Sequence, residues 1–153
     1  HGLPIGVGMA LAAKMRKQNH RVVVLTGDGE INEGSIWESA LSAAKHKLNN
    51  LIVIVDYNKL QSYGSVQEVL NLEPIVDKWQ SFGFGVKEVD GHDTKALKEL
   101  LAKLPFDSPC PNTVICHTIK GKGVHFAENN PKWHHKSGLK KVDLQALHES
   151  ISS

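Results

Sequence analysis

Long apolar segments are absent from this sequence of 153 residues. Its apolar runs, such as Val22 to Leu25 and Leu51 to Val55, are far shorter than the roughly 20 residues that a membrane-spanning helix needs. A marked excess of one charge is absent too, because 18 basic residues face 16 acidic ones and the basic residues are spread along the chain. The sequence therefore indicates neither a membrane protein nor a nucleic-acid-binding protein.

Cysteine is scarce, and the usual metal-binding patterns are missing. Cys110 and Cys116 lack the close spacing of a zinc or redox pair, and the histidines lack the spacing of zinc ligands. We therefore expect reduced thiols in a cytoplasmic protein. The first residues, from His1 to Pro4, resemble the middle of a domain, so we expect the natural protein to begin earlier.

The remaining composition is ordinary, and it is arranged as alternating strand and helix patterns. With 41% hydrophobic and 22% charged residues, the chain is expected to form one globular domain over residues 1–153. Apolar and β-branched runs predict strands at 21–26, 51–55, 86–89 and 113–117. Helical spacing predicts helices at 4–18, 35–48 and 94–104, the last capped by Asp93 or Thr94.

The order of these elements predicts an α/β fold, a parallel sheet flanked by helices on both faces. Because the run at 21–26 is almost unbroken, we expect its strand to be covered on both faces. Between the main elements we expect an irregular stretch at 56–65 and a helical region broken at Pro74. A long loop at 121–141 and a short helix from about Asp143 should follow.

Two polar residues follow neighbouring strands of this predicted sheet. Asp28 comes after the strand at 21–26, and Asn58 comes 30 positions later, after the next strand. Because ligands bind beyond the carboxyl ends of parallel strands, we expect the two side chains to face one another. A carboxylate and an amide oxygen, joined by a loop carbonyl, suit Mg²⁺.

Glycines on either side of Asp28 favour a phosphate nearby. Gly27 and Gly29 permit a tight turn in which backbone N–H groups approach phosphate oxygens, and the helix that follows should add its positive end. The alternative is that Asp28 merely caps that helix. Gly6 and Gly8 are better explained by close helix packing than by a dinucleotide motif, because Leu11 stands where the third glycine is required.

These residues resemble a known family. The GDG turn with its asparagine is similar to the thiamine diphosphate signature, and the string GDGEINEGSIWESALSAAKHKLNNLIVIVDYNKLQ resembles transketolases, specifically the N-terminal, diphosphate-binding subunits of two-chain transketolases. The resemblance continues through VDGHD at 89–93 and HTIKGKGV at 117–124. It implies a thiamine diphosphate-binding fold, with the chain as the domain that holds the diphosphate.

The resemblance also implies roles for individual residues. Asp28 and Asn58 would bind Mg²⁺, or Ca²⁺ or Mn²⁺ in its place, through their side chains, and Leu60 through its carbonyl oxygen. The remaining cofactor contacts would come from Gly27, Gly29, Glu30 and His134. Catalytic roles are implied for His134 and Glu33.

Some of these assignments leave alternatives open. His135 stands beside His134 where most relatives have glycine, so either histidine can be the inward one. Glu33 and Glu38 match acidic residues near a dimer contact in the family, but solvent exposure at the start of a helix explains them equally well. Ser62 and Tyr63 depart from the apolar residue and aspartate of many relatives.

The implied activity is transfer of a two-carbon ketol unit from a ketose to an aldose. It needs a partner that supplies the pyrimidine-binding domain, and a dimer of such pairs is expected. Lys120, Lys122 and Lys136 are candidates for contacting a sugar phosphate, although solvated lysines are the commoner case. The competing hypotheses are the α subunit of a 2-oxo acid dehydrogenase, a cofactor-binding module without catalysis, and a scaffold that binds no cofactor.

Overall fold

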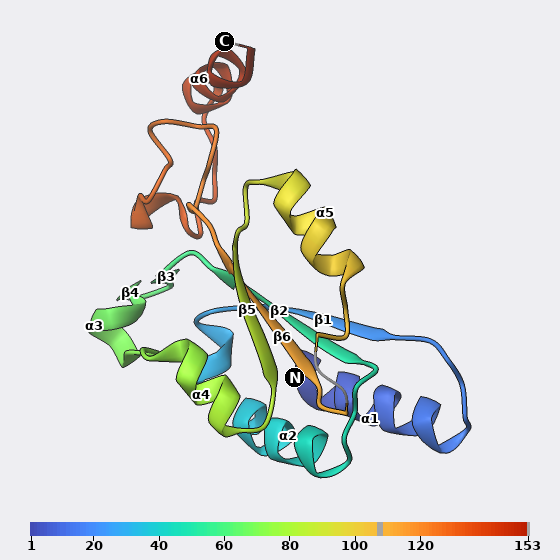
Figure 1. The fold of residues 1–153 in the computed structure, drawn as a ribbon. Coiled ribbons are helices and arrows are strands. Elements are labelled where there is room, and N and C mark those ends of the chain that lie inside the picture. Colours follow the sequence, from blue (N-terminus) through green and yellow to red (C-terminus); the bar gives the residue numbers. More distant parts are fainter. Residues whose placement is uncertain (107–108, 153) are drawn as a thin grey trace.

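The computed structural model describes residues 1–106 and 109–152, and its centre is a four-stranded parallel sheet. The strands are β1 (Val22–Gly27), β2 (Leu51–Tyr57), β5 (Gly85–Asp90) and β6 (Asn112–His117), in the order β1-β2-β6-β5. One face of the sheet carries α1 (Gly2–Met15), α2 (Gly34–Lys45) and α4 (Ile75–Ser81), and the other carries α5 (Thr94–Ala102) (Figure 1). The predicted α/β fold is confirmed.

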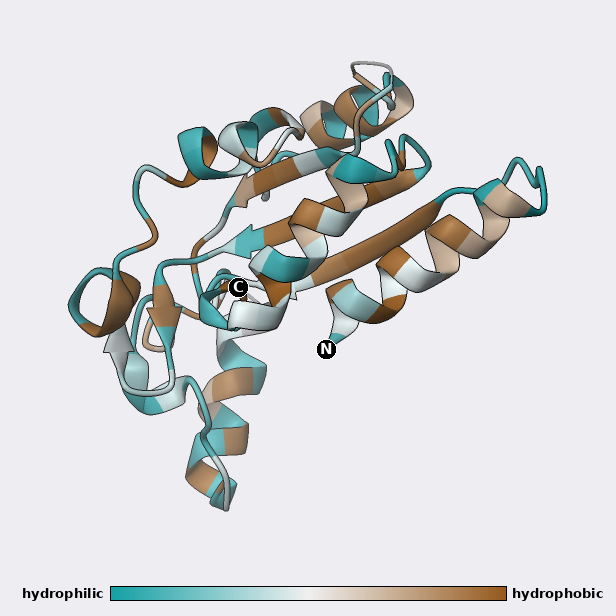
Figure 2. Ribbon diagram, turned by 90° about the horizontal axis from the view of Figure 1, so that it is seen from below, coloured by the Kyte–Doolittle hydropathy of each residue, from teal (hydrophilic) through white to brown (hydrophobic). Residues whose placement is uncertain are grey.

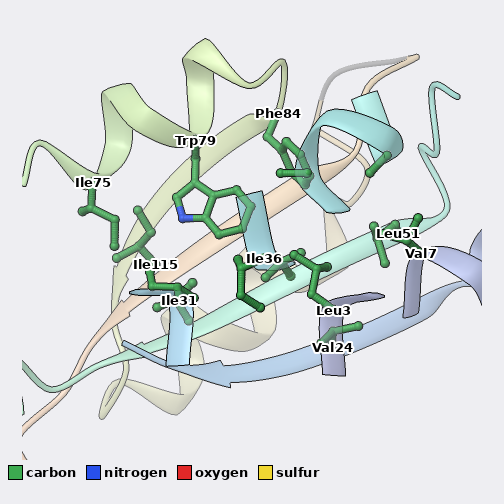
Figure 3. Close-up of a cluster of buried hydrophobic side chains, with 14 of the residues drawn as sticks. Leu3, Val7, Val24, Ile31, Ile36, Leu51, Ile75, Trp79, Phe84 and Ile115 are labelled. Atoms are coloured by element: carbon green, nitrogen blue, oxygen red, sulfur yellow. The ribbon is translucent and has the colours of Figure 1, made fainter. Parts of the chain in front are cut away.

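A single apolar core joins the three-helix layer to the sheet. Figure 3 shows Leu3, Ile36 and Trp79 reaching from the helices toward the strands. All three are fully buried, and each large apolar side chain removed from water contributes roughly 1.5–3 kcal/mol. This packing holds the three helices against one face of the sheet.

The predicted helices are present, but each ends two or three residues early. The C-terminal ends of α1 and α2 are followed by Lys17 and Lys47, which adopt positive φ angles of 56° and 49°. Glycine usually fills that position, so these lysines carry no stop signal in the sequence. Asp93 is the cap of α5, because its side chain accepts hydrogen bonds from the N–H groups of Lys95 and Ala96.

The stretch predicted to be irregular at 56–65 is partly regular, so that prediction was wrong in part. Strand β2 continues through Tyr57 because β6 provides a hydrogen-bonding partner that far along. Beyond it, β3 (Leu60–Gln61) pairs antiparallel with β4 (Gly64–Ser65). Helix α3 (Val66–Leu70) follows, and the break before α4 includes Pro74, as expected.

The prediction that β1 is covered on both faces was wrong. Val22, Val24 and Thr26 are buried, the two valines close to Gly6 of α1, whereas Val23 is 57% exposed and Leu25 is 70% exposed. In the part of the chain that the structure describes, β1 is one of the two edge strands of this sheet, and it pairs with β2 alone. Figure 2 shows that the strands beside α1 are strongly apolar.

The C-terminal part is mostly loop. It contains the 3-10 helix η2 (Pro131–Trp133) and ends in α6 (Lys141–Ser152), which projects from the body of the molecule and starts two residues earlier than predicted (Figure 1). Among residues 1–106 and 109–152, no helix has both the length and the apolar character needed to cross a bilayer.

Candidate functional site

The register of the sheet brings three chain segments to one edge. Gly27 of β1 pairs with Asp56 of β2, and Tyr57 of β2 pairs with His117 of β6. Since the three strands run in the same direction, the residues that follow them emerge side by side.

A cavity of about 310 Å³ lies at this edge. Its lining contains every residue to which the family resemblance assigns a role in cofactor binding. The lining residues are Gly27, Asp28, Gly29, Glu30, Asp56, Asn58, Leu60, Gln61, Ser62, Lys120 and His134.

Asp28 connects the first two segments. Its Oδ1 accepts a hydrogen bond of 2.7 Å from the Gly29 N–H, and its Oδ2 accepts one of 2.5 Å from the Lys59 N–H. The side chain is only 1% exposed. It therefore ties the turn after β1 to the loop after β2.

The structure does not support the alternative in which Asp28 caps the next α-helix. That helix, α2, begins at Gly34, and its N-cap is Glu33. A short 3-10 helix, η1 (Glu30–Asn32), stands between them. The helix that directly follows the turn is therefore η1, and its N-cap Gly29 and first residue Glu30 line the cavity. The expected contribution of a positive helix end to phosphate binding stays a prediction.

Burial sets the electrostatics of Asp28. Desolvation raises the pKa of its carboxyl group, and the hydrogen bonds from Lys59 and Gly29 oppose that rise. Nearby Asp56 raises this pKa further, and Lys120 lowers it. A cation in the cavity would favour the charged form, so the environment suits a metal ligand.

Asn58 lines the cavity from the second loop. The Oδ1 atom accepts a hydrogen bond of 3.0 Å from the Leu60 N–H, and the Nδ2 atom donates one of 3.1 Å to Asp56 Oδ2. The donor set of carboxylate, amide and loop carbonyl oxygens fits Mg²⁺. No cluster of three or more His, Cys, Asp or Glu side chains suited to a metal occurs within the described residues.

The two adjacent histidines take different directions. His134 lines the cavity, and its buried Nδ1 has no hydrogen-bond partner. Desolvation lowers the pKa of His134, and the charges of Lys120 and His135 lower it further. His135 is exposed, and its Nε2 lies 2.8 Å from Ser62 Oγ. His134 is therefore the inward histidine.

Only one of the three candidate lysines lines the cavity. Lys120 does so, whereas Lys122 lies 3.8 Å from Glu128 and Lys136 lies over the Trp133 ring. This arrangement leaves Lys120 as the cation placed to meet an anionic ligand.

Glu33 and Glu38 are both exposed and lie outside the cavity lining of the described chain. The catalytic role expected of Glu33 stays a prediction.

Sequence reasoning missed Asp56, Gln61 and Ser62 as lining residues. Asp56 was assigned to a loop, although its position before Asn58 at a strand end was a usable signal. The Nε2 atom of Gln61 is buried without a partner, like His134 Nδ1. Two unpartnered polar atoms therefore belong to residues of this one cavity.

Comparison with known proteins decides the family. The model described as "Transketolase, thiamine diphosphate binding domain" matches residues 2–152. The chain belongs to the transketolase family. This result confirms the resemblance found in the sequence and favours a transketolase over a 2-oxo acid dehydrogenase.

Individual transketolases agree with this assignment. The chain is 46% identical over 136 residues to an apulose-4-phosphate transketolase subunit of Actinobacillus succinogenes, covering 89% of this chain and 49% of that protein. It is 41% identical over 127 residues to the 6-deoxy-6-sulfo-D-fructose transketolase subunit SqwG of a Clostridium species, covering 83% and 46%. The chain spans about half the length of these curated relatives.

A solved structure extends the agreement to three dimensions. The crystal structure of the transketolase from Campylobacter jejuni matches with a TM-score of 0.88 at 29% identity, over 99% of this chain and 24% of that one. The parallel sheet and its helices are thus arranged as in a transketolase.

Proposed function

We propose that this chain binds thiamine diphosphate and Mg²⁺ as the N-terminal subunit of a two-chain transketolase. Together with a partner that carries the pyrimidine-binding domain, it transfers a two-carbon ketol unit from a ketose to an aldose. The supporting observation is the meeting of Asp28, Asn58 and Leu60 at one cavity, although Asp28 lies 30 or more positions before the other two.

Different lining residues would bind the metal and the phosphate groups. Asp28, Asn58 Oδ1 and the Leu60 carbonyl would hold the metal, which Ca²⁺ or Mn²⁺ can replace. Backbone N–H groups around Gly27 and Gly29 would bind phosphate oxygens, and Lys120 would balance their charge.

When bound, thiamine diphosphate would supply the carbon nucleophile needed to cleave a ketose. The chain's own contribution to proton transfer would come from His134, which the lowered pKa keeps neutral near pH 7 and able to hold or release a proton at Nδ1. A sugar phosphate would meet Lys120, which suits an anionic substrate.

A separate partner chain is favoured because two of the relatives are named as subunits. Glu33 and Glu38 are exposed and so accessible for the dimer contact that the family resemblance implies. We place the assembly in the cytoplasm.

Calorimetry on the chain with thiamine diphosphate and Mg²⁺ tests the site. Asp28→Ala should abolish Mg²⁺-dependent binding, because it removes the charged ligand, while Asp77→Ala on the surface of α4 should leave binding unchanged. Equal affinity of the Asp28→Ala chain and the wild type would refute the site.

Gly27→Ala gives a second test that spares the fold. A Cβ atom built on Gly27 meets no protein atom within 4 Å, and the same is true of Gly34, the matched control. Gly27→Ala should weaken cofactor binding about tenfold or more by intruding on the phosphate position, which corresponds to about 1.4 kcal/mol. Gly34→Ala should not.

Activity is then measured with the partner chain added. Cofactor-dependent ketol transfer across a panel of sugar donors is the expected result. Binding without any turnover would instead support a non-catalytic module, and 2-oxo acid decarboxylation would assign the chain to the competing enzyme class.

A further inference from the structure

Asp56 has no role in the proposed function, yet it is hydrogen-bonded to several residues around the proposed metal position. Its Oδ2 accepts the 3.1 Å hydrogen bond from Asn58 Nδ2, and its Oδ1 accepts a hydrogen bond from the Thr118 hydroxyl group. Its carbonyl oxygen also accepts from the Asp28 N–H at 3.2 Å. One residue of β2 therefore contacts all three segments at the edge of the sheet.

The chemistry of a carboxylate decides how the Asn58 amide is turned. The oxygen and nitrogen of an amide are nearly equal in size, so packing alone does not choose between its two orientations. A carboxylate accepts hydrogen bonds and donates none, so only the NH₂ group of Asn58 can face Asp56. The amide oxygen must then point the other way, where it accepts the Leu60 N–H.

Thr118 makes this choice rigid. Its hydroxyl donates to Asp56 Oδ1 and leaves Oδ2 as the atom that faces Asn58. Thr118 itself is held by its backbone N–H, which donates to the Tyr57 carbonyl at 3.3 Å. Hydrogen bonds thus link Thr118, which follows β6, through Asp56 to Asn58.

We propose that Asp56 is a positioning residue that turns the oxygen of Asn58, and not its nitrogen, toward the cation. The identity of the cation rests on the proposed function, but the amide orientation is a property of the chain alone. Metal sites commonly depend on such outer partners, whose loss lowers metal affinity about 10- to 100-fold.

An exchange of the two side chains separates positioning from simple loss of charge. Asp56→Leu removes the acceptor of the Asn58 NH₂ group and puts no polar group in its place. Asp56→Asn would not serve, because the Thr118 hydroxyl also accepts hydrogen bonds, so the new NH₂ group can face Thr118 and leave an oxygen facing Asn58. In Asp56→Leu the Asn58 amide is no longer held with its oxygen toward the cation. In the double variant Asp56→Asn with Asn58→Asp, the NH₂ group of residue 56 donates to the carboxylate of residue 58, whose second oxygen faces the cation.

The first experiment needs no ligand. In nuclear magnetic resonance spectra of the unliganded chain, the Asn58 side-chain NH₂ signals should show a bonded proton shifted downfield, and Asp56→Leu should remove that shift. Asp90→Leu is the matched control, because Asp90 ends β5 at the same edge and accepts a hydrogen bond from the His92 N–H. Unchanged Asn58 signals in Asp56→Leu would overturn the proposal.

The second experiment measures Mg²⁺-dependent binding of thiamine diphosphate by calorimetry. Asp56→Leu should weaken binding by about tenfold or more, the exchange variant should recover most of the loss, and Asp90→Leu should bind like the wild type. An exchange variant that binds no better than Asp56→Leu, with an equal melting temperature, would contradict positioning. If the wild type does not bind at all, the proposed function fails, and the spectra still decide the orientation.

Discussion

Tyr57 lies immediately before Asn58 and anchors the end of β2 to the segment between α3 and α4. The residue is 3% exposed, and its hydroxyl donates a 2.6 Å hydrogen bond to Glu73 Oε1. Glu73 Oε2 accepts from the Ile75 N–H at 2.9 Å, which fixes the carboxylate in turn. The loop with the predicted metal ligands therefore starts from an immobilised residue.

This anchor predicts a pH dependence of stability. Burial, followed by the hydrogen bond and negative charge of Glu73, raises the pKa of Tyr57 above its ordinary value of about 10. Above pH 10 the unfolded chain releases the Tyr57 proton, whereas the folded chain keeps it. The stabilisation of the fold by the Tyr57–Glu73 hydrogen bond is therefore complete below pH 10 and is lost as the pH rises beyond it. Urea unfolding of wild type and Tyr57→Phe should differ by about 1 kcal/mol at neutral pH and by less above pH 10.

Phenolate absorbance gives the direct readout, measured in a Tyr63→Phe background so that Tyr57 is the sole tyrosine. Its ionisation should coincide with alkaline unfolding. Glu73→Gln removes the nearby charge and should move the ionisation to lower pH. If Tyr57 ionises at its ordinary pKa in the folded chain, the claim that Glu73 anchors a buried Tyr57 hydroxyl is refuted.

At the scale of elements, α1 lies unusually close to the sheet. A Cβ atom on Gly6 would come within 2.3 Å of Val24 Cγ2, whereas one on Gly8 meets nothing within 4 Å. Both glycines lie in the same helix, and only Gly6 is buried. The sequence interpretation of Gly6 as a packing residue is confirmed, and that of Gly8 is not.

These two glycines form a matched pair for a stability test. Gly6→Ala should lower the free energy of unfolding by about 1–3 kcal/mol, because α1 must move away from β1. Gly8→Ala should raise it by about 0.5–1 kcal/mol through its better helix propensity. Denaturant titration measures both, and equal effects at the two positions would refute the close packing.

Strand and helix existence followed from the sequence because apolar periodicity reports burial directly. The exact ends of the strands and helices were predicted less well. Lys17 and Lys47 end helices in a conformation that their side chains do not announce, and the β3–β4 ribbon depends on a two-residue pairing too short to leave a pattern. The 3-10 helix η1 was not predicted either, because its three residues are also too few to leave a pattern.

The candidate site was predictable where a residue acts through its own chemistry and fixed spacing. Asp28 and Asn58 are such residues, and the cavity contains both. Asp56 and Gln61 line it because of how strands are registered and how a loop turns back. The register and the loop turn are tertiary facts. The sequence offers for Asp56 only its place before Asn58 at a strand end, and it offers no signal for Gln61.

At the scale of the whole molecule, the two faces of the sheet are unequally covered. The α5 face carries a shallow apolar hollow of about 210 Å³, lined by Arg21, Val23, Ile52, Ile54, Leu101 and Leu104. Val23 in this hollow is 57% exposed, whereas its neighbour Val24 on the opposite face is 8% exposed.

Valine-to-threonine substitutions at these neighbours test the asymmetry, because the side chains have nearly the same shape. Val24→Thr should cost about 1–3 kcal/mol of unfolding free energy, since a hydroxyl is buried without a partner. Val23→Thr should cost less than about 0.5 kcal/mol and reduce binding of a fluorescent hydrophobic dye. Equal costs would mean that the α5 face is as well covered as the α1 face.

The pairing of Gly27 with Asp56 has a consequence for how freely this protein can change in length. Neighbouring strands set the distance between the oxygen donors through their shared ladder of backbone hydrogen bonds, and the crossover through α2 only has to return the chain to the start of β2. A turn of helix added to or removed from that crossover would alter the 30-residue interval and leave the donors where they are. Distant homologues should therefore be aligned by their strand ends, with the count of intervening residues left free to vary.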